Sequence, residues 1–125
     1  METTDNDYEI FQSEVRRLMV EYGLNEWGVY FQRQDLDGSY AEISVDDEHK
    51  TATFIFAKTI EDEAVEYLDV KRTARHEVFH LLLAPLSDLA SRRFVNQLQL
   101  YSAEEAMVNK LLYITKDSVD ETVTP

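Results

Sequence analysis

The sequence predicts a single α+β domain with an N-terminal helix, a small three-stranded or larger antiparallel or mixed sheet, and two later helices. Three observations lead to this fold class. The chain has 125 residues, of which 44% are hydrophobic and 11% aromatic, enough for one core and too few for two. Apolar residues alternate with a period of two in the first half, and they recur at helical spacing before and after that region. We expect the domain to span residues 1–115 and a flexible tail to span residues 116–125.

The first element is a helix over residues 7–22, followed by Gly23 at the position of a C-terminal cap. Three strand-like segments come next, and each places its apolar residues on one face. These segments are EWGVYFQR, SYAEISV and KTATFIFAK. Polar turn residues separate them, as in a meander of antiparallel hairpins. His49 lies in the second turn, where we expect it to be solvated and not a metal ligand.

The second half of the chain is helical in pattern. One helix begins somewhere between Ile60 and Val70 and is predicted to end at Pro85, because proline disfavours helical geometry in the residue before it. Residues 86–101 have an ambiguous pattern that one short helix would fit. A final helix is expected over residues 102–114, with Ser102 as its N-cap and Glu105 completing a capping box.

The composition excludes several classes of function. The formal net charge is −13, and all of it lies in residues 1–69, since residues 70–125 contain seven acidic and seven basic side chains. This charge disfavours binding to nucleic acid or to an anionic membrane, while it is compatible with either solubility or a basic partner. The chain has no cysteine, no apolar run that could cross a bilayer and an acidic start instead of a signal peptide, so we expect a cytoplasmic protein.

The stretch HEVFH contains His76, Glu77 and His80. On a helix, residues four apart leave the same face, so the two imidazoles can bind one zinc ion. Glu77 lies about 100° around the helix from His76, where its carboxylate can take a proton from a metal-activated water as general base. The alternative is a half-buried helix whose histidines bond to backbone carbonyls. We favour the hydrolytic zinc site, because burying these three polar side chains together is costly without a metal or hydrogen bonds.

A catalytic zinc ion needs a third protein ligand, and the final helix offers Glu104 and Glu105. Glu105 is the better candidate because Asn109 follows four residues later on the same helix face. From there the Asn109 side chain could orient the free ring nitrogen of a liganding histidine. Glu104 has Val108 at the corresponding position, and a role as a charge near the helix N-terminus is sufficient for it.

The stretches ARHEVFHLLL and EAMVNKLL resemble the gluzincin type of zinc metallopeptidase. More narrowly, they are similar to the minigluzincins and the ImmA/IrrE-type peptidases, which include short phage-encoded relatives. The resemblance covers roughly residues 66–114 and implies a zincin-like domain with His76, His80 and Glu105 as zinc ligands. It also implies that Glu77 is the base, that Asn109 supports a ligand, and that an edge strand of the sheet binds an extended substrate.

From these observations we expect a zinc-dependent metallopeptidase that hydrolyses peptide bonds in a peptide or protein substrate. The alternative is a non-catalytic or latent binding protein with the same fold, since 125 residues leave little chain for substrate subsites and the charge suits an acidic regulator. A third possibility is a metal-free helix in which the two histidines occur by coincidence.

Overall fold

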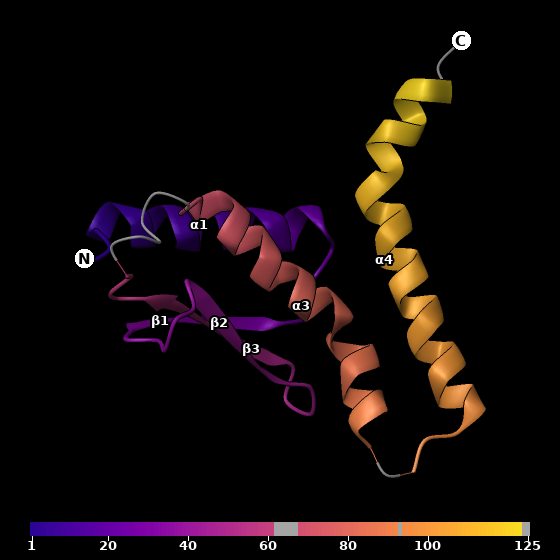
Figure 1. Cartoon of the computed structure of the whole chain (residues 1–125). Helices are drawn as coiled ribbons and strands as arrows, with labels where there is room; N and C mark the ends of the chain where they lie inside the picture. Colours follow the sequence, from indigo (N-terminus) through magenta and orange to yellow (C-terminus); the bar gives the residue numbers. More distant parts are fainter. Residues whose placement is uncertain (62–67, 93, 124–125) are drawn as a thin grey trace.

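A computed structural model of the chain describes residues 1–61, 68–92 and 94–123. Within these residues the regular structure consists of three long helices and one three-stranded mixed sheet. The helices α1 and α3 lie over one side of the sheet, and α4 runs beside the far half of α3 (Figure 1). The predicted α+β class is therefore confirmed.

Helix α1 spans Asp5–Glu21. It begins with a reciprocal capping box: the Thr4 hydroxyl accepts a hydrogen bond from the Asp7 N–H, and the Asp7 carboxylate accepts one from the Thr4 N–H, each at 3.0 Å. The helix ends at Tyr22, and Gly23 follows with φ +68°, the left-handed conformation that glycine adopts without steric cost. The predicted first helix and its glycine terminator are thus confirmed.

The three strands are β1 (Gly28–Gln34), β2 (Ala41–Asp46) and β3 (Thr51–Ala57), and their order in the sheet is β1-β3-β2. Only β2 and β3 form the expected antiparallel hairpin, whereas β1 pairs with β3 in parallel. The predicted meander is therefore wrong for its first connection. The physical reason is burial, because β3 contributes Ala52, Phe54 and Phe56, all fully buried, and the most apolar strand occupies the centre.

The core lies between the sheet and the pair α1 and α3, where α3 spans Val70–Ser91. Phe11 of α1 packs against Phe54 and Phe56, with its ring centroid 4.9 Å from that of Phe56. Helix α3 contributes three fully buried residues to the same cluster, namely Ala74, Val78 and Leu81. This inner face holds α3 against the sheet and determines which residues it turns outward.

Helix α3 continues through Pro85 to Ser91, so the predicted end at Pro85 is wrong. Pro85 cannot donate a main-chain hydrogen bond and its ring crowds the carbonyl one turn earlier, but contacts in the following turn support the helix. Arg92 forms an ion pair with Asp88 at 2.7 Å, and the Ser91 hydroxyl donates to the Asp88 carbonyl at 2.8 Å. The helix begins at Val70; residues 62–67, within the interval expected for its start, lie outside the described part of the chain.

Helix α4 spans Gln97–Val123, so it starts before Ser102 and ends beyond residue 114, contrary to prediction. Asn96 is the cap: its side-chain oxygen accepts from the Gln99 N–H, and the Gln99 side-chain oxygen accepts from the Asn96 N–H. Most of segment 116–125, for which a tail was expected, is helical backbone. At the other end of the core, the Lys110 ammonium donates to the Gly23 carbonyl, which joins α4 to the end of α1.

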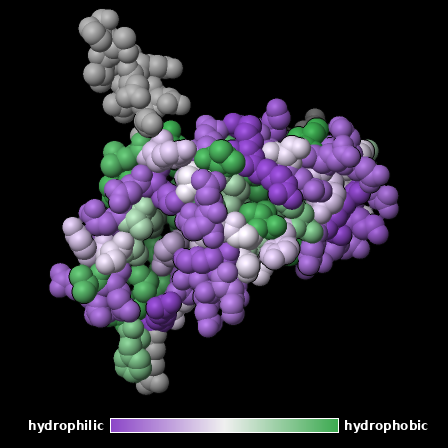
Figure 2. All heavy atoms as spheres, turned by 180° about the vertical axis from the view of Figure 1, so that it is seen from behind, coloured by the Kyte–Doolittle hydropathy of each residue, from purple (hydrophilic) through white to green (hydrophobic). Residues whose placement is uncertain are grey.

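Large exposed apolar side chains lie mainly on the two later helices. They include Leu83 and Leu86 of α3 and Leu98, Leu111 and Leu112 of α4. Figure 2 shows hydrophobic surface on the side of the molecule that carries α4, whereas the opposite end is mostly hydrophilic. None of the helices in the described residues is both long and apolar enough to cross a lipid bilayer.

Candidate metal and catalytic site

The two histidines of HEVFH lie side by side on the outward face of α3. Their positions follow from the helix itself, because Ala74, Val78 and Leu81 occupy the buried face and leave His76 and His80 exposed. The Nε2 atoms of the two rings are 3.2 Å apart. The structure therefore brings the predicted imidazole pair together.

This spacing fits two ligands of one tetrahedral ion. Zinc–nitrogen bonds are about 2.05 Å long, and two such bonds with their nitrogens 3.2 Å apart enclose an angle of about 100° at the metal. The same separation also permits a weak hydrogen bond from one ring to the other. The pair has the donor chemistry that zinc prefers, and a catalytic zinc site would need a third protein ligand besides two such imidazoles.

Glu77 differs from its histidine neighbours because it is buried, with 6% of its surface exposed. No hydrogen bond or ion pair joins its carboxyl group to any other residue in the described part of the chain. Burial, and to a lesser extent the negative charge of Glu42, raises the pKa of Glu77 from 4.5 to about 7. A carboxyl group with such a pKa can both accept and release a proton near neutral pH.

The histidines and Glu77 line a groove between α3 and β2, made of two hollows that meet at Ala41, His76 and Glu77. The larger hollow, about 630 Å³, continues towards the C-terminal ends of both elements. The smaller hollow, about 350 Å³, continues towards Arg72 and the residues before β2. An extended chain lying in this groove would pass Glu77 near its middle.

Among the described residues, β2 pairs with β3 on one side only, and its other edge lies along this groove without a strand partner there. The Ala57 N–H donates to the Tyr40 carbonyl, so Tyr40 faces β3 with its main-chain groups. In an antiparallel ladder this orientation alternates, and the main-chain groups of Ala41, Ile43 and Val45 must then point to the free side. All three residues also line the larger hollow. Tertiary structure thus identifies β2 as the edge strand beside the motif.

The structure does not bring Glu104 or Glu105 to the histidine pair. Within the described residues, neither glutamate has a carboxylate oxygen within 4.8 Å of both imidazoles. The reason lies in the face that α4 presents: Ala103 is buried and lines a hollow against the end of α3, and Glu105 lies about 200° around the helix from Ala103. Glu104, Glu105 and Asn109 are all exposed. Glu105 as third ligand therefore stays a prediction.

Three acidic residues of the larger hollow were not anticipated from the sequence, namely Glu42, Asp47 and Asp88. Glu42 belongs to an outward-facing position of β2, and Asp88 lies beyond the proline at which α3 was expected to end. The available signal was their acidity, but nothing local showed that they would lie beside the HEVFH segment.

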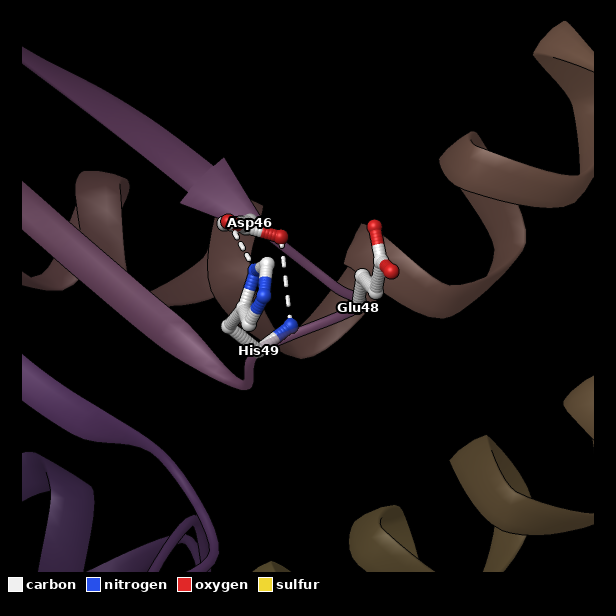
Figure 3. A group of neighbouring side chains, drawn as sticks. All are labelled: Asp46, Glu48 and His49. Carbon is white, nitrogen blue, oxygen red and sulfur yellow. Dashed lines mark hydrogen bonds and ion pairs between the residues drawn. The ribbon is translucent and has the colours of Figure 1, made fainter.

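A second group of possible ligands lies on the turn between β2 and β3 and consists of Asp46, Glu48 and His49. All three are exposed, and the Asp46 carboxylate already accepts hydrogen bonds from the His49 backbone N–H at 3.2 Å and from its ring at 2.7 Å. These bonds keep the pKa of Asp46 below its usual value. In Figure 3 hydrogen bonds join Asp46 and His49, whereas Glu48 lies beside them without a bond to either, its carboxylate within 4.8 Å of their ligand atoms. The group therefore stabilises the turn, and His49 is a solvated turn residue, as expected.

Comparison of the chain with protein-family models, curated proteins and solved structures finds no match. The geometry of the groove is thus the basis on which a function can be argued.

Proposed function

We propose that the protein is a zinc-dependent metallopeptidase with a zincin-like domain, which hydrolyses peptide bonds. One observation carries the proposal: a buried carboxyl group without a partner in the described chain, that of Glu77, lies in the middle of a groove beside two imidazole nitrogens 3.2 Å apart. A coincidental pair of histidines does not require a costly buried acid at the same place.

In this proposal His76 and His80 hold the ion through their Nε2 atoms. Zinc bound there would supply a Lewis acid that polarises the substrate carbonyl and acidifies a water molecule. Glu77 accepts the proton of the attacking water on a carboxylate oxygen and later delivers it to the leaving amine. Its raised pKa suits this exchange, since the carboxyl group can be charged before the attack and neutral after it near pH 7.

The substrate in this proposal is an extended peptide or protein segment that pairs with the free edge of β2. Its main chain would bond to the groups of Ala41, Ile43 and Val45, which fix its distance from α3. The two hollows then hold the residues on the two sides of the bond to be cut. The groove is open to solvent, so no unfolding of the enzyme is needed for a chain to enter.

Glu105 remains the proposed third ligand and Asn109 its supporting residue, which requires α4 to present another face to α3 when zinc is bound. Glu42 lies in the groove itself and is the competing carboxylate. One experiment separates these assignments, namely measurement of metal content by mass spectrometry. The test variants are Glu105→Ala and Glu42→Gln, and Glu104→Ala is the matched control for Glu105→Ala. Loss of zinc in Glu105→Ala alone supports the proposal, whereas loss only in Glu42→Gln transfers the third position to β2.

Catalysis is tested with Glu77→Gln, which keeps the size of the side chain but removes the base. We expect the parent protein to bind about one zinc ion per chain and to cleave a mixed peptide library in a manner that chelation abolishes. Glu77→Gln should keep its zinc and lose about 10²- to 10⁴-fold in kcat. Full activity in this variant, or a parent that takes up no zinc, would contradict the proposal.

The alternative is an acidic binding protein on the same scaffold, in which the groove captures a chain without cutting it. One observation favours it, namely that no third ligand in the described residues joins His76 and His80 in the groove. The distinguishing result is stoichiometric binding of a partner that is recovered intact in the presence of zinc. If His76→Ala changes neither metal content nor stability, the histidines serve neither as metal ligands for catalysis nor as metal ligands in a binding protein.

A further inference from the structure

Glu42 lies in the groove, and the proposed reaction assigns no role to it when Glu105 is the third zinc ligand. Its side chain is exposed at an outward position of β2, and it lines the larger hollow together with His76, Glu77 and His80. Within the described chain, no hydrogen bond or ion pair engages its carboxylate. Glu42 is also close enough to Glu77 for the two negative charges to repel each other. An unneutralised carboxylate therefore lies where a bound chain must pass.

Charge is unevenly distributed along the groove. Besides Glu42, the larger hollow is lined by Asp47 and Asp88, which form ion pairs with Lys50 and Arg92 at 2.9 and 2.7 Å. No lysine or arginine of the described residues is itself part of that lining. In the smaller hollow, by contrast, Asp69 and Arg72 are both lining residues and balance each other. The larger hollow therefore favours a positive charge, and Glu42 is its carboxylate without a partner in the described chain.

The register of β2 shows how such a charge would reach Glu42. A chain paired with the free edge places the residue directly opposite Glu42 on the same face of the extended sheet, with Cβ atoms about 5 Å apart. A lysine or arginine at that position can bring its charged group to the Glu42 carboxylate without leaving the strand conformation. A glutamate there would face a like charge at the same distance.

A second, independent feature indicates that this hollow receives a ligand. Glu77 is more than nine-tenths buried, has no partner within the described residues, and opens into the same space. Since no fully buried side-chain oxygen of the described residues lacks a hydrogen-bond partner, the unpaired Glu77 carboxyl group must reach the groove, where a ligand can bond to it.

We propose that Glu42 is a specificity-determining residue, which selects extended substrates with a lysine or arginine opposite it in the larger hollow. The inference rests on the proposed peptidase function and names the substrate class of that same groove. Because the ion pair is exposed, its effect is modest: cross-strand and surface ion pairs contribute about 0.2 to 1 kcal/mol, which corresponds to about a 1.4- to 5-fold preference.

The test uses the zinc-loaded full chain and peptides that differ at one position at a time, where lysine, glutamine or glutamate is placed on either side of the cut. The parent protein should show a higher kcat/KM for lysine than for glutamine, up to about fivefold, at a position on one side of the cut. Glu42→Gln should lose this preference and Glu42→Lys should reverse it in favour of glutamate. Glu48→Gln, which removes the same charge from the neighbouring turn outside the groove, should keep the preference of the parent.

The proposal is overturned if the parent has no charge preference at any position, or if Glu42→Gln retains the preference for lysine. A binding measurement separates this failure from failure of the peptidase proposal. Fluorescence anisotropy of labelled lysine and glutamine peptides on Glu77→Gln, with and without Glu42→Gln, reports selectivity without cleavage. Selective binding that depends on Glu42, combined with no cleavage by the parent, supports Glu42 and rejects the peptidase. Cleavage without charge preference supports the peptidase and rejects the role of Glu42. Absence of both binding and cleavage rejects both proposals.

Discussion

Replacing Glu77 by glutamine should stabilise the metal-free protein at alkaline pH. In the folded chain the pKa of Glu77 is raised to about 7, mainly because burial disfavours the charged carboxylate, whereas in the unfolded chain it has its ordinary value near 4.5. The charged form is therefore better tolerated by the unfolded chain. Glu77 leaves stability intact below about pH 4.5, and it reduces stability progressively as the pH rises through about 7.

The size of this effect follows from the difference between the two pKa values. A difference of about 2.5 pH units corresponds to about 3 kcal/mol, of which about 2 to 3 kcal/mol develops between pH 5 and pH 8. This figure is an upper bound, because the carboxyl group opens into a solvated groove. Glutamine has nearly the same volume and no charge, so the variant should lack this loss of stability.

The assay is urea unfolding of both proteins at pH 5 and pH 8 in the presence of a chelator. We expect the two proteins to differ by less than about 1 kcal/mol at pH 5. At pH 8 the variant should be more stable by about 2 to 3 kcal/mol, a midpoint shift of about 1 to 2 M urea. Glu104→Gln, at an exposed position, is the control and should follow the parent at both pH values. Parallel pH dependences of the parent and Glu77→Gln would refute the reasoning.

Two further predictions concern the metal and the contact between α1 and α4. Zinc at 100 times its dissociation constant should stabilise the parent by about 2.7 kcal/mol in thermal or urea unfolding. His80→Ala should not gain this stability from zinc. Equal stabilisation of both proteins would mean that the ion binds elsewhere. Gly23→Ala should reduce the free energy of unfolding by about 1 to 2 kcal/mol, because φ at Gly23 is +68° and a Cβ atom there would lie 3.3 Å from the Tyr113 ring. An unchanged urea midpoint in this variant would show that the close approach of α4 does not persist in solution.

The sequence by itself determined those features that depend on neighbours along the chain. The period-two alternation identified all three strands, and the helical spacing together with Gly23 identified α1. The pairing of His76 with His80 belongs to the same class, since residues four apart on any α-helix lie on one face about one turn apart. These features follow from local backbone geometry, which the rest of the fold does not alter.

Local signals were insufficient where tertiary contacts compensated for them. Pro85 was expected to end the helix, but the buried residues before it and the Asp88–Arg92 ion pair after it support a continuous α3. Ser102 was expected to cap the start of α4, but Asn96, six residues earlier in the chain, has the same capping chemistry and caps the helix instead. In both cases several positions had acceptable local chemistry, and packing selected among them.

Tertiary structure alone decided the features on which function depends. The order β1-β3-β2 leaves β2 at the edge because the more apolar β3 is better buried at the centre, but the composition of the strands does not show with which neighbours each one pairs. The burial of Glu77 and its raised pKa arise only when α3 lies against the sheet, and Glu42 approaches Glu77 only across that interface. A sequence motif can thus specify which chemical groups share a helix face, but the environment that sets their pKa and charge comes from segments distant in the chain.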